Sequence, residues 1–517
     1  MRLNRTKNAK KNIVWGLCNK ILFMVFPFAL RAMIIQTVGA EYLGIDSLFI
    51  SILQVLSLAE LGFGEAIVYS MYRPIANDDK ALIGKILGFY RKVYRRIGIA
   101  ILVIGLMLMP FLKYLVHGSY PNEINIYTLY FIYLFNTVIS YWLFAYKQSI
   151  FNAYMQQYVI ANVNMLVRLV VYILQLIVLW FLNNFYLYVL MIVINTVISN
   201  LILNHYVEKL HPDILCTEHL NCEIKADIFE KIKGLIIGKV TGVFRNAMDS
   251  VFVSAFVGLI ATGVYANYFM ILAGVQSFFM LLYESYASGA GNSIVLDSKE
   301  KNYRDLCYLS FFYMWLAGWV TICLCCLYQP FIKIVFGENM LFSDSVMLLF
   351  CAYFYVLRIG DILSLYSRGN GLWWKERYRS IGETLSNLLL TYILGYMYGV
   401  AGILVATIIS LLLCGAIWGA LITFLNYFQS GLKKYACMHI KYFAWTILVV
   451  WVMYRMCNQI SSTLWGEFFL RLVICLFIPN ILYWMRYRHT QIYKDSMSWL
   501  LKRIQIPRIL RKMLLSE

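Results

Sequence analysis

The chain has 517 residues, of which 61% are hydrophobic and only 14% are charged, and its formal net charge is +19. Soluble domains are about half apolar and about a quarter charged, so this composition excludes an ordinary soluble domain and indicates a membrane protein with many spans. The positive charge would suit a nucleic-acid binder, but its placement along the chain follows membrane topology instead.

Fourteen apolar runs are long enough, at about 20 residues, to cross a bilayer as helices. In chain order they predict spans at 12–37, 42–71, 97–116, 124–146, 158–181, 185–204, 233–257, 263–287, 306–328, 345–367, 379–397, 400–425, 440–457 and 464–485. The predicted fold class is therefore an all-α polytopic membrane protein with about fourteen transmembrane helices. Because the number of spans is even, both termini are expected on one side.

Lysines and arginines gather on that same side. The N-terminus, the even-numbered loops and the C-terminal tail hold 35 of the 45, and the odd-numbered loops hold about three. Cytoplasmic loops carry such an excess, so both termini are predicted to be cytoplasmic, and no nucleic-acid partner is needed to explain the charge. The most basic segments, 72–96 and 486–517, are candidates for amphipathic helices that lie on membrane lipids.

Spans 1 and 2 recur as spans 7 and 8 at an offset of 219 residues. The offset aligns Val38-Gly39 with Val257-Gly258, Gly44 with Gly263, Lys20 with Lys239 and Glu65 with Glu284. Charges inside spans are rare, so the two charged matches are the informative ones. An offset of six spans preserves orientation, which predicts two parallel, pseudosymmetric six-helix lobes with a substrate site between them.

The repeat and the loops predict five regions. They are an N-terminal lobe at 1–204, a cytoplasmic linker at 205–232, a C-terminal lobe at 233–425, two added spans at 426–485 and a basic cytoplasmic tail at 486–517. The linker is mixed in charge and is the longest stretch outside the predicted spans. The added spans have no counterpart in the repeat.

Seven basic side chains lie inside the predicted spans. They are Lys20, Arg31, Arg168, Lys239, Arg245, Arg358 and Arg471. Each costs roughly 2.5–3.5 kcal/mol at a helix centre, so most must face a polar interior rather than lipid. An interior with many cations and few acids suits an anionic cargo, and the guanidinium group binds phosphate through two parallel hydrogen bonds.

Four arginines are the predicted phosphate ligands, namely Arg31, Arg168, Arg245 and Arg358. Two of them have an acid nearby on the same helix. Arg358 precedes Asp361 by three residues and Arg245 precedes Asp249 by four, so pairing within the helix stays an open alternative. Arg471 lies in an added span and is set aside as a structural residue.

Four acids inside the spans are candidates for coupling to H⁺ or Na⁺, namely Glu60, Glu65, Glu284 and Glu383. Lys20 and Glu65 lie at similar depth, and the repeat gives Lys239 and Glu284 the same relation. Each Lys–Glu pair is either a neutral structural pair that pins two helices or a gating site. Asp46 is expected near the outer surface, as a helix-end or interface residue.

The region around the first loop carries a transporter motif. It reads Arg31-Ala-Met-Ile-Ile-Gln-Thr-Val-Gly-Ala-Glu-Tyr-Leu-Gly44, then Leu58-Ala-Glu-Leu-Gly-Phe-Gly-Glu-Ala66 and Tyr69-Ser-Met-Tyr-Arg-Pro-Ile-Ala76. Together with Ile139-Ser-Tyr-Trp-Leu-Phe-Ala-Tyr-Lys147, it resembles the Wzx-type polysaccharide (O-antigen or capsule repeat-unit) flippases of the multidrug/oligosaccharidyl-lipid/polysaccharide (MOP) exporter superfamily. Glu65 departs from the pattern, because many relatives carry a small residue there.

The resemblance implies a fourteen-helix, two-lobed, MATE-like fold in the bacterial inner membrane. It implies alternating access that moves an undecaprenyl-pyrophosphate-linked oligosaccharide from the cytoplasmic to the outer leaflet for surface polysaccharide synthesis. Polysaccharide polymerase machinery is then an expected partner. Tyrosine and tryptophan side chains in a lumen would stack on the sugars.

Other functions fit the sequence less well. An enzyme acting on lipid-linked sugars would need an exposed catalytic loop, and the predicted outer loops are short, so no enzymatic activity is expected. A drug/cation antiporter of the same fold would favour acids over cations in its interior. A flippase for the peptidoglycan lipid precursor moves a similar polyprenyl pyrophosphate, so cargo chemistry alone does not separate it from a polysaccharide flippase.

The twelve cysteines show no metal-ligand spacing. Cys323, Cys325 and Cys326 share one apolar run. The thiols are therefore expected to be reduced and buried among apolar side chains, and neither a metal site nor a cofactor is predicted.

Overall fold

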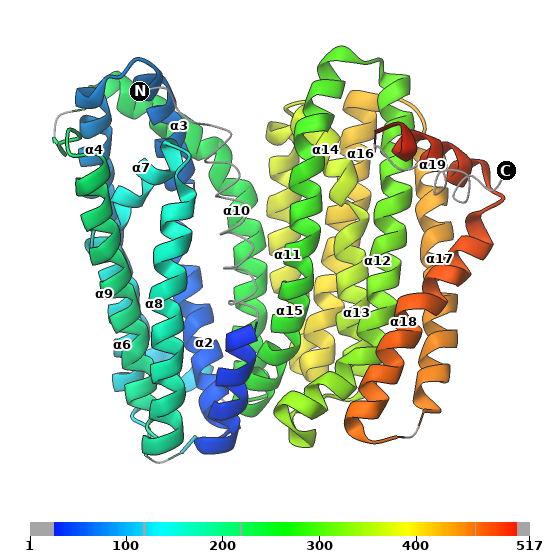
Figure 1. Ribbon diagram of the computed structural model, residues 1–517, viewed down its shortest axis with the longest axis horizontal. Coiled ribbons are helices and arrows are strands. Elements are labelled where there is room, and N and C mark those ends of the chain that lie inside the picture. The colour runs from blue at the N-terminus through cyan, green and yellow to red at the C-terminus, as the bar shows by residue number, and fades with distance from the viewer. Residues whose placement is uncertain are drawn as a thin grey trace. The chain divides into compact units, whose positions relative to one another are not determined.

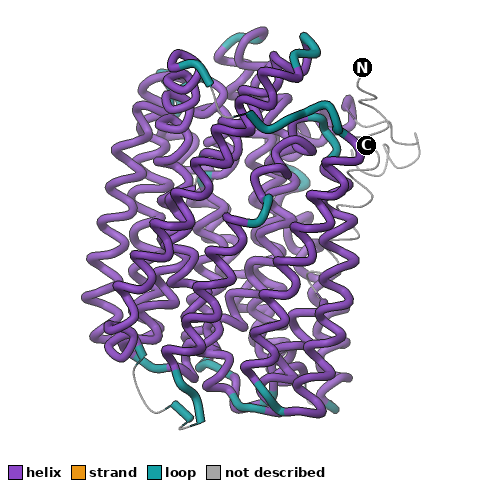
Figure 2. Tube along the Cα trace, turned by 90° about the vertical axis from the view of Figure 1, so that its left-hand side faces the viewer, coloured by secondary structure: helices purple, strands orange, loops and turns teal. Residues whose placement is uncertain are grey.

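The structure is a computed structural model that describes residues 25–60, 62–116, 120–121, 123–217, 220–460 and 462–503 (Figure 1). Within these ranges the chain consists of helices and loops, and Figure 2 shows no strand in the part that it describes. Nine of the described helices, or ten when one bent pair is taken as a single span, are long and apolar enough to cross a membrane. The predicted all-α polytopic fold is thus confirmed.

The chain divides into two compact units, Met1–Ala266 (unit 1) and Asn267–Glu517 (unit 2). Unit 1 contains a first helix Val25–Thr37, α2 (Ala40–Leu56), α3 (Phe63–Ala76), α4 (Lys80–Leu108), α5 (Leu112–Leu115), α6 (Ile126–Trp142), α7 (Gln148–Ala153), α8 (Gln157–Ile177), α9 (Phe185–Leu210), α10 (Cys222–Phe256) and the start of α11 (Leu259–Leu296). α10 packs against α2, α3 and α5 in this unit.

Unit 2 contains the rest of α11 and the helices that follow it. They are α12 (Lys299–Phe336), α13 (Asp344–Ile359), α14 (Asp361–Gly369), α15 (Trp373–Ser410), α16 (Gly419–Thr423), α17 (Leu432–Asn458), α18 (Leu464–Tyr487) and α19 (Gln491–Arg503). α12 is the centre of this unit, because α13, α17, α18 and α19 all pack against it. α17 and α18 correspond to the two spans that the sequence predicts as an addition to the repeat, 440–457 and 464–485.

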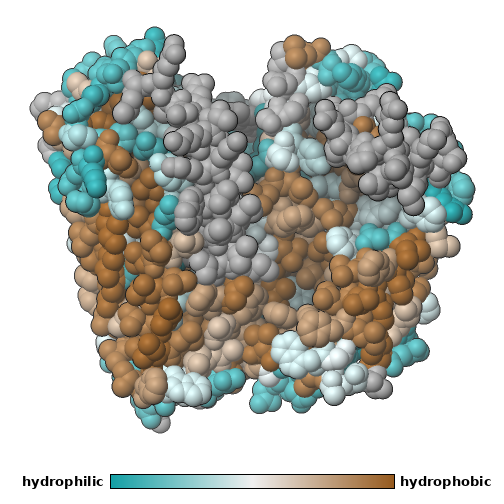
Figure 3. Space-filling model, in the orientation of Figure 1, coloured by the Kyte–Doolittle hydropathy of each residue, from teal (hydrophilic) through white to brown (hydrophobic). Residues whose placement is uncertain are grey.

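The surface of each unit is apolar where a bilayer would cover it. Figure 3 shows hydrophobic residues over the middle of both units and hydrophilic residues at their ends. Leu389 of α15 and Phe477 of α18 are each 63% exposed, and many other large apolar side chains are exposed with them. Soluble proteins rarely expose so much apolar surface, so these helices face lipid and the protein is a multi-pass membrane protein.

The repeat appears in the backbone of unit 1. Gly39 ends the first helix with φ of 120°, and its aligned partner Gly258 ends α10 with φ of 122°, a region that favours glycine. The Gly39 amide donates to Ile34 O at 2.9 Å, and the Gly258 amide donates to Val253 O at 3.0 Å. The turn at Gly39 joins the first helix to α2, and the turn at Gly258 joins α10 to α11. Residues 219 apart thus make the same turn between two equivalent pairs of helices.

Two predicted spans are broken rather than continuous. In the span predicted at 42–71, α2 ends at Leu56, a 3₁₀ turn covers Ser57–Glu60, and Gly62, with φ of 93°, precedes α3. In the span predicted at 124–146, α6 bends by 48° into Ala145–Ala153. The residue at this bend, Phe144, has φ of 53°. Irregular backbone at membrane depth is tolerated where it is buried in protein or lines a water-filled cavity.

The basic segment 72–96 does not form a separate surface helix, so that prediction is wrong. α3 continues to Ala76 and α4 runs without interruption from Lys80 to Leu108, so the basic residues extend a span instead. In the tail, α19 does form a helix, and it packs on α12 through the Trp499 indole, which donates to Asp305 at 2.8 Å. Residues 504–517 lie outside the described ranges.

The predicted linker 205–232 is partly helical. α9 continues to Leu210 and α10 begins at Cys222, and the described residues between them, 211–217 and 220–221, are not helical. This segment is held against the start of α4. Lys80 Nζ lies 2.6 Å from Asp213 Oδ2, and the Thr217 amide donates to Gly84 O at 3.2 Å.

Candidate functional site

A cavity of about 860 Å³ lies in unit 1, where the two broken spans meet. Its walls come from the 3₁₀ turn and α3, from α4, from the bend between α6 and α7, and from α8 and α9. Figure 1 places α3, α7 and the start of α4 at the same end of the unit. Ligand pockets measure about 300–1,000 Å³, so the cavity is large enough for a bound molecule.

The lining is polar and aromatic. It includes five tyrosines, four side-chain amides, two serines and two carboxylates, namely Tyr69, Tyr72, Tyr90, Tyr94, Tyr141, Gln148, Asn152, Gln157, Asn200, Ser140, Ser149, Glu60 and Glu65. No lysine, arginine or histidine is among the described residues that line it. The cavity therefore offers aromatic faces, hydrogen-bond donors and acceptors, and negative charge.

Glu60 is held in the cavity wall by tyrosine hydroxyls. Tyr90 Oη donates to Tyr94 Oη at 2.7 Å, and Tyr94 Oη donates to Glu60 Oε1. The hydroxyl of Tyr141 also interacts with this carboxylate by a hydrogen bond. The rings of Tyr90 and Tyr94 pack edge to face with centroids 4.4 Å apart. This contact fixes the chain of hydrogen bonds from Tyr90 through Tyr94 to Glu60, the Glu60 relay.

Glu65 lies on one face of α3 with two exposed tyrosines. Tyr69 follows Glu65 by four residues and Tyr72 by seven, which is the spacing of one helix face. The side chains of Tyr69 and Tyr72 are 62% and 50% exposed, and their rings contact each other edge to face at 6.1 Å. This face presents a carboxylate and two aromatic rings to the cavity.

Two glycines shape the entrance to α3. Gly62 takes the left-handed conformation that ends the 3₁₀ turn, and a Cβ at Gly64 would lie 3.2 Å from Tyr90 Oη. The close approach keeps Tyr90 beside the helix start. The motif Leu58–Ala66, which carries the family resemblance, therefore builds the broken span and the cavity wall.

Arg31 belongs to a buried cluster away from the cavity lining. It interacts electrostatically with Asp46 of α2 and with Tyr188 of α9, and Tyr133 of α6 donates a hydrogen bond to Asp46. Asp46 is only 6% exposed and lies seven residues into α2, so it is a buried partner of a cation. The carboxylate is buried because it faces a cation on the neighbouring helix.

The four predicted phosphate ligands lie on four different helices, with Arg31 on the first helix. Arg168 on α8 and Arg245 on α10 are half-buried in unit 1. Arg358 lies in unit 2, is 8% exposed, and places Nη1 at 2.9 Å from Asp361 Oδ2. Its guanidinium also lies over the ring of Phe279, at 5.5 Å. The structure thus contains the Arg358–Asp361 pair that the sequence left as an alternative. The two residues lie at the break between α13 and α14.

The remaining predicted charges are dispersed. Glu284 is exposed on α11, and Glu383 is buried on α15, where Arg379 Nη1 donates to Glu383 Oε2 at 3.2 Å. Lys20 precedes the first described residue, and Lys239 lies on α10 with its side chain outside the part that the structure describes. The two Lys–Glu pairs of the repeat therefore stay predictions.

Sequence reasoning missed the cavity tyrosines as a group. Tyr90 and Tyr94 lie on α4 and Tyr141 lies on α6, with no common motif, so only the fold brings the two helices together. The spacing of Glu65, Tyr69 and Tyr72 on one helix face was the signal available in the sequence. Asp46, fifteen residues after Arg31, had no such local signal because its partner lies on another helix.

No protein-family model matches the sequence, and no curated protein sequence does so either. Solved structures do match. The inward-facing conformation of a multidrug resistance MATE family transporter of the MOP superfamily has a TM-score of 0.62 at 15% identity, covering 81% of this chain and 99% of that one. The lipid II flippase MurJ, in its inward closed conformation, has a TM-score of 0.65 at 16% identity, covering 92% and 99%.

A mutant of the Vibrio cholerae MATE transporter VcmN also matches, with a TM-score of 0.52 at 16% identity, covering 83% of this chain and 98% of that one. Sequence identities of this size show a common fold. The chain therefore has the fold that MATE transporters of the MOP superfamily share with the lipid II flippase MurJ.

Proposed function

We propose that the chain is a flippase of the MOP exporter superfamily for an undecaprenyl-pyrophosphate-linked oligosaccharide. It would move this lipid from the cytoplasmic to the outer leaflet of a bacterial inner membrane, for surface polysaccharide synthesis. The observation that carries the proposal is the tyrosine- and amide-lined cavity built by the two broken spans of unit 1.

The cavity chemistry suits a glycan. Sugar rings offer flat C–H faces that stack on tyrosine, and they offer hydroxyl groups that exchange hydrogen bonds with amides, serines and carboxylates. Tyr69 and Tyr72 provide exposed rings, and Glu60 provides a carboxylate already held by tyrosines. A preformed set of partners lowers the entropy lost on binding.

The pyrophosphate is assigned to the arginines outside the cavity lining. Arg31, Arg168 and Arg245 all belong to unit 1, as the cavity does, whereas Arg358 belongs to unit 2, where it pairs with Asp361. We therefore place the pyrophosphate with the unit 1 arginines and give Arg358 a structural part. Guanidinium groups keep their charge at membrane depth and bind phosphate oxygens in pairs.

Coupling to H⁺ or Na⁺ is assigned to the acids of the cavity, Glu60 and Glu65, ahead of Glu284 and Glu383. The Lys20–Glu65 and Lys239–Glu284 pairs would act as gates between the access states. The membrane potential also favours outward movement of an anion, by about 2.3 kcal/mol per charge per 100 mV. Both termini would be cytoplasmic, and polymerase machinery would receive the product.

One observation favours a second candidate function. The described cavity lining carries two carboxylates and no basic side chain, which suits a cationic cargo, as in a drug/cation antiporter. The fold is equally that of the lipid II flippase MurJ, so the peptidoglycan lipid precursor is the third candidate cargo.

A deletion strain separates the three candidates. The proposed function predicts that lipid-linked oligosaccharide accumulates in the cytoplasmic leaflet, with unchanged resistance to cationic drugs and unchanged lipid II turnover. Complementation by the wild-type chain should clear it, and complementation by Tyr69→Ala/Tyr72→Ala should not. Loss of drug resistance alone would support the antiporter, and accumulation of lipid II alone would support the precursor flippase.

A further inference from the structure

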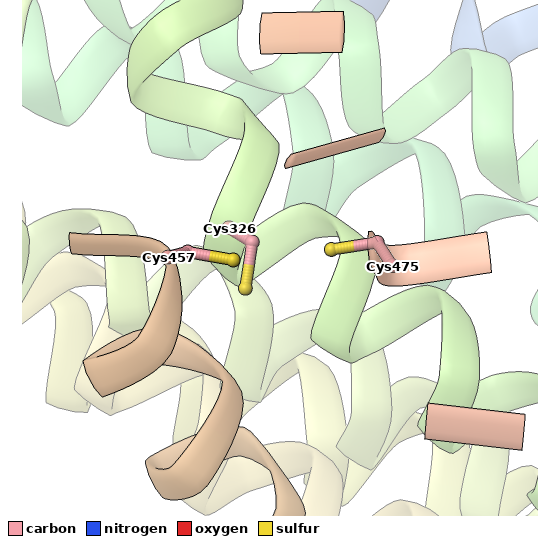
Figure 4. Close-up of side chains that lie close together, drawn as sticks. All are labelled: Cys326, Cys457 and Cys475. Atoms are coloured by element: carbon pink, nitrogen blue, oxygen red, sulfur yellow. The ribbon is translucent and has the colours of Figure 1, made fainter. Parts of the chain in front are cut away.

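Three cysteines from separate helices of unit 2 meet in its interior. Cys326 lies on α12, Cys457 on α17 and Cys475 on α18, and their sulfur atoms all lie within 4.8 Å of one another. Each side chain is at most 1% exposed. Figure 4 shows the sulfurs of Cys326 and Cys457 side by side, with Cys475 pointing toward them from a third helix.

Hydrogen bonds fix the backbone at two of the three positions. The Trp319 indole donates to Cys475 O at 2.8 Å. Arg471 Nη1 donates to Cys326 O at 3.3 Å, and the same guanidinium pairs with Glu467 one turn earlier on α18. The thiol of Cys326 lies within hydrogen-bond reach of both Cys457 and Cys475. The cluster is therefore built by α12, α17 and α18 together.

The spacing matches what a thiophilic ion needs. A zinc–sulfur bond of about 2.3 Å places the sulfurs of one coordination sphere about 3.8–4.0 Å apart. The three sulfurs already lie within 4.8 Å of each other, so small side-chain rotations would close them on one ion. Thiolates select Zn²⁺ and Cu⁺ over hard cations such as Mg²⁺.

Charge favours a bound cation over three free thiolates. Metal binding releases the thiol protons, and the cation offsets part of the charge of the resulting thiolates in an interior that disfavours net charge. The guanidinium of Arg471 stands beside the cluster and interacts electrostatically with Cys457. Any remaining negative charge thus has a positive neighbour.

We propose that Cys326, Cys457 and Cys475 form a binding site for a thiophilic d¹⁰ cation, Zn²⁺ or Cu⁺. The bound ion ties the two added helices, α17 and α18, to α12. Cys457 is the second-last residue of α17. The site lies in unit 2 and is independent of the function proposed for the unit 1 cavity. The sequence predicted no metal site because the three ligands are far apart in the chain.

The test uses the full-length protein in detergent, kept reduced and stripped of metal. Cd²⁺ serves as the spectroscopic probe for the Zn²⁺ arm, and Cu⁺ is offered from a competing chelator in the second arm. We expect one ion per chain, a thiolate-to-metal charge-transfer band and a higher unfolding temperature. Tighter binding in one arm identifies the ion.

Variants of the three cysteines decide the assignment. Cys326→Ala, Cys457→Ala and Cys475→Ala should each weaken binding at least tenfold, whereas Cys351→Ala, a buried cysteine of α13 outside the cluster, should not. If a variant elutes as aggregate, protection of the wild-type thiols from alkylation by Cd²⁺ provides the second measurement. Binding unchanged in Cys475→Ala, binding lost in Cys351→Ala, or wild-type thiols that alkylate equally with and without metal would overturn the proposal. A disulfide between two of the three in the reduced protein would do so too.

Discussion

Gly44 of α2 lies directly against the backbone of Leu259 at the start of α11. A Cβ at Gly44 would stand 2.0 Å from Leu259 O, closer than any real contact. Its repeat partner Gly263 makes the matching approach, with Ala40 O and Gly44 N each 3.2 Å from its own Cβ position. Two repeat-related glycines thus allow two repeat-related helices to cross with their backbones in contact, as small residues do in membranes.

Gly44→Ala should destabilise the protein by about 1–3 kcal/mol, because the new methyl group has no room unless α2 and α11 separate. Gly242→Ala on α10 is the matched control, since no atom lies within 4 Å of its Cβ position. Thermal unfolding in detergent checks the pair. Equal unfolding temperatures for the two variants would show that the crossing is not tightly packed.

Asp46→Leu should destabilise unit 1 by about 3–5 kcal/mol, because it removes the buried acid that faces the half-buried Arg31. The double variant Arg31→Met/Asp46→Leu should recover most of that loss, since no uncompensated charge remains. Unfolding temperature measures the structural part, and glycan-lipid translocation measures the functional part. A double variant that is stable but inactive supports phosphate binding by Arg31; a stable, active one removes Arg31 from the phosphate site.

Tyr94→Phe should lower translocation severalfold while changing stability by only about 1 kcal/mol, because it removes the hydroxyl that donates to Glu60. Tyr130→Phe is the control, since Tyr130 is equally buried and its hydroxyl donates at 3.2 Å to Gly105 O, away from the cavity lining. Similar translocation by the two variants would remove the Glu60 relay from the mechanism.

The docking of segment 211–221 on α4 should weaken in acid. Burial lowers the pKa of His211, so below its ordinary value of about 6.5 protonation favours the undocked segment. The hydrogen bond from Lys80 lowers the pKa of Asp213, so the stabilisation from this pair is present above about pH 4 and disappears as the pH falls through the lowered pKa.

Hydrogen exchange at the Thr217 amide, which donates to Gly84 O, reports this docking. Lys80→Gln should speed exchange relative to wild type at neutral pH, and the difference should shrink as Asp213 is protonated. Comparison at equal pH cancels the intrinsic pH dependence of exchange. A difference that stays constant with pH would show that the Lys80–Asp213 pair does not hold the segment.

Much of the fold follows from the sequence because span-length hydrophobicity and charge asymmetry are local properties. The end of the first helix at Gly39 and the start of α17 and α18 near the predicted spans are examples. The kink inside α15 at Gly399, with φ of 58°, also falls between the predicted spans 379–397 and 400–425. Gly39, Gly399 and Gly431 fix the geometry at three of these points by permitting positive φ.

The site was less predictable because its parts meet only in three dimensions. The break at Ser57–Glu60 is invisible to a hydropathy window, since four residues change the mean of a window of about 19 residues only a little. The depth of Arg358 in its span predicts a phosphate ligand, yet its guanidinium pairs with Asp361 and lies over the ring of Phe279. The sequence does not predict the negatively charged cavity, because the residues that line it come from separate helices that meet only in the fold.

The central claim is that the unit 1 cavity receives the glycan of a polyprenyl-pyrophosphate lipid. The most direct measurement is the rate at which purified protein, reconstituted in vesicles, moves a fluorescent lipid-linked oligosaccharide between leaflets. We predict transport by the wild type, at least tenfold slower transport by Tyr69→Ala/Tyr72→Ala, and wild-type transport by Tyr130→Phe. A wild-type protein that moves cationic drugs against a proton gradient and leaves the glycan lipid in place would contradict the account.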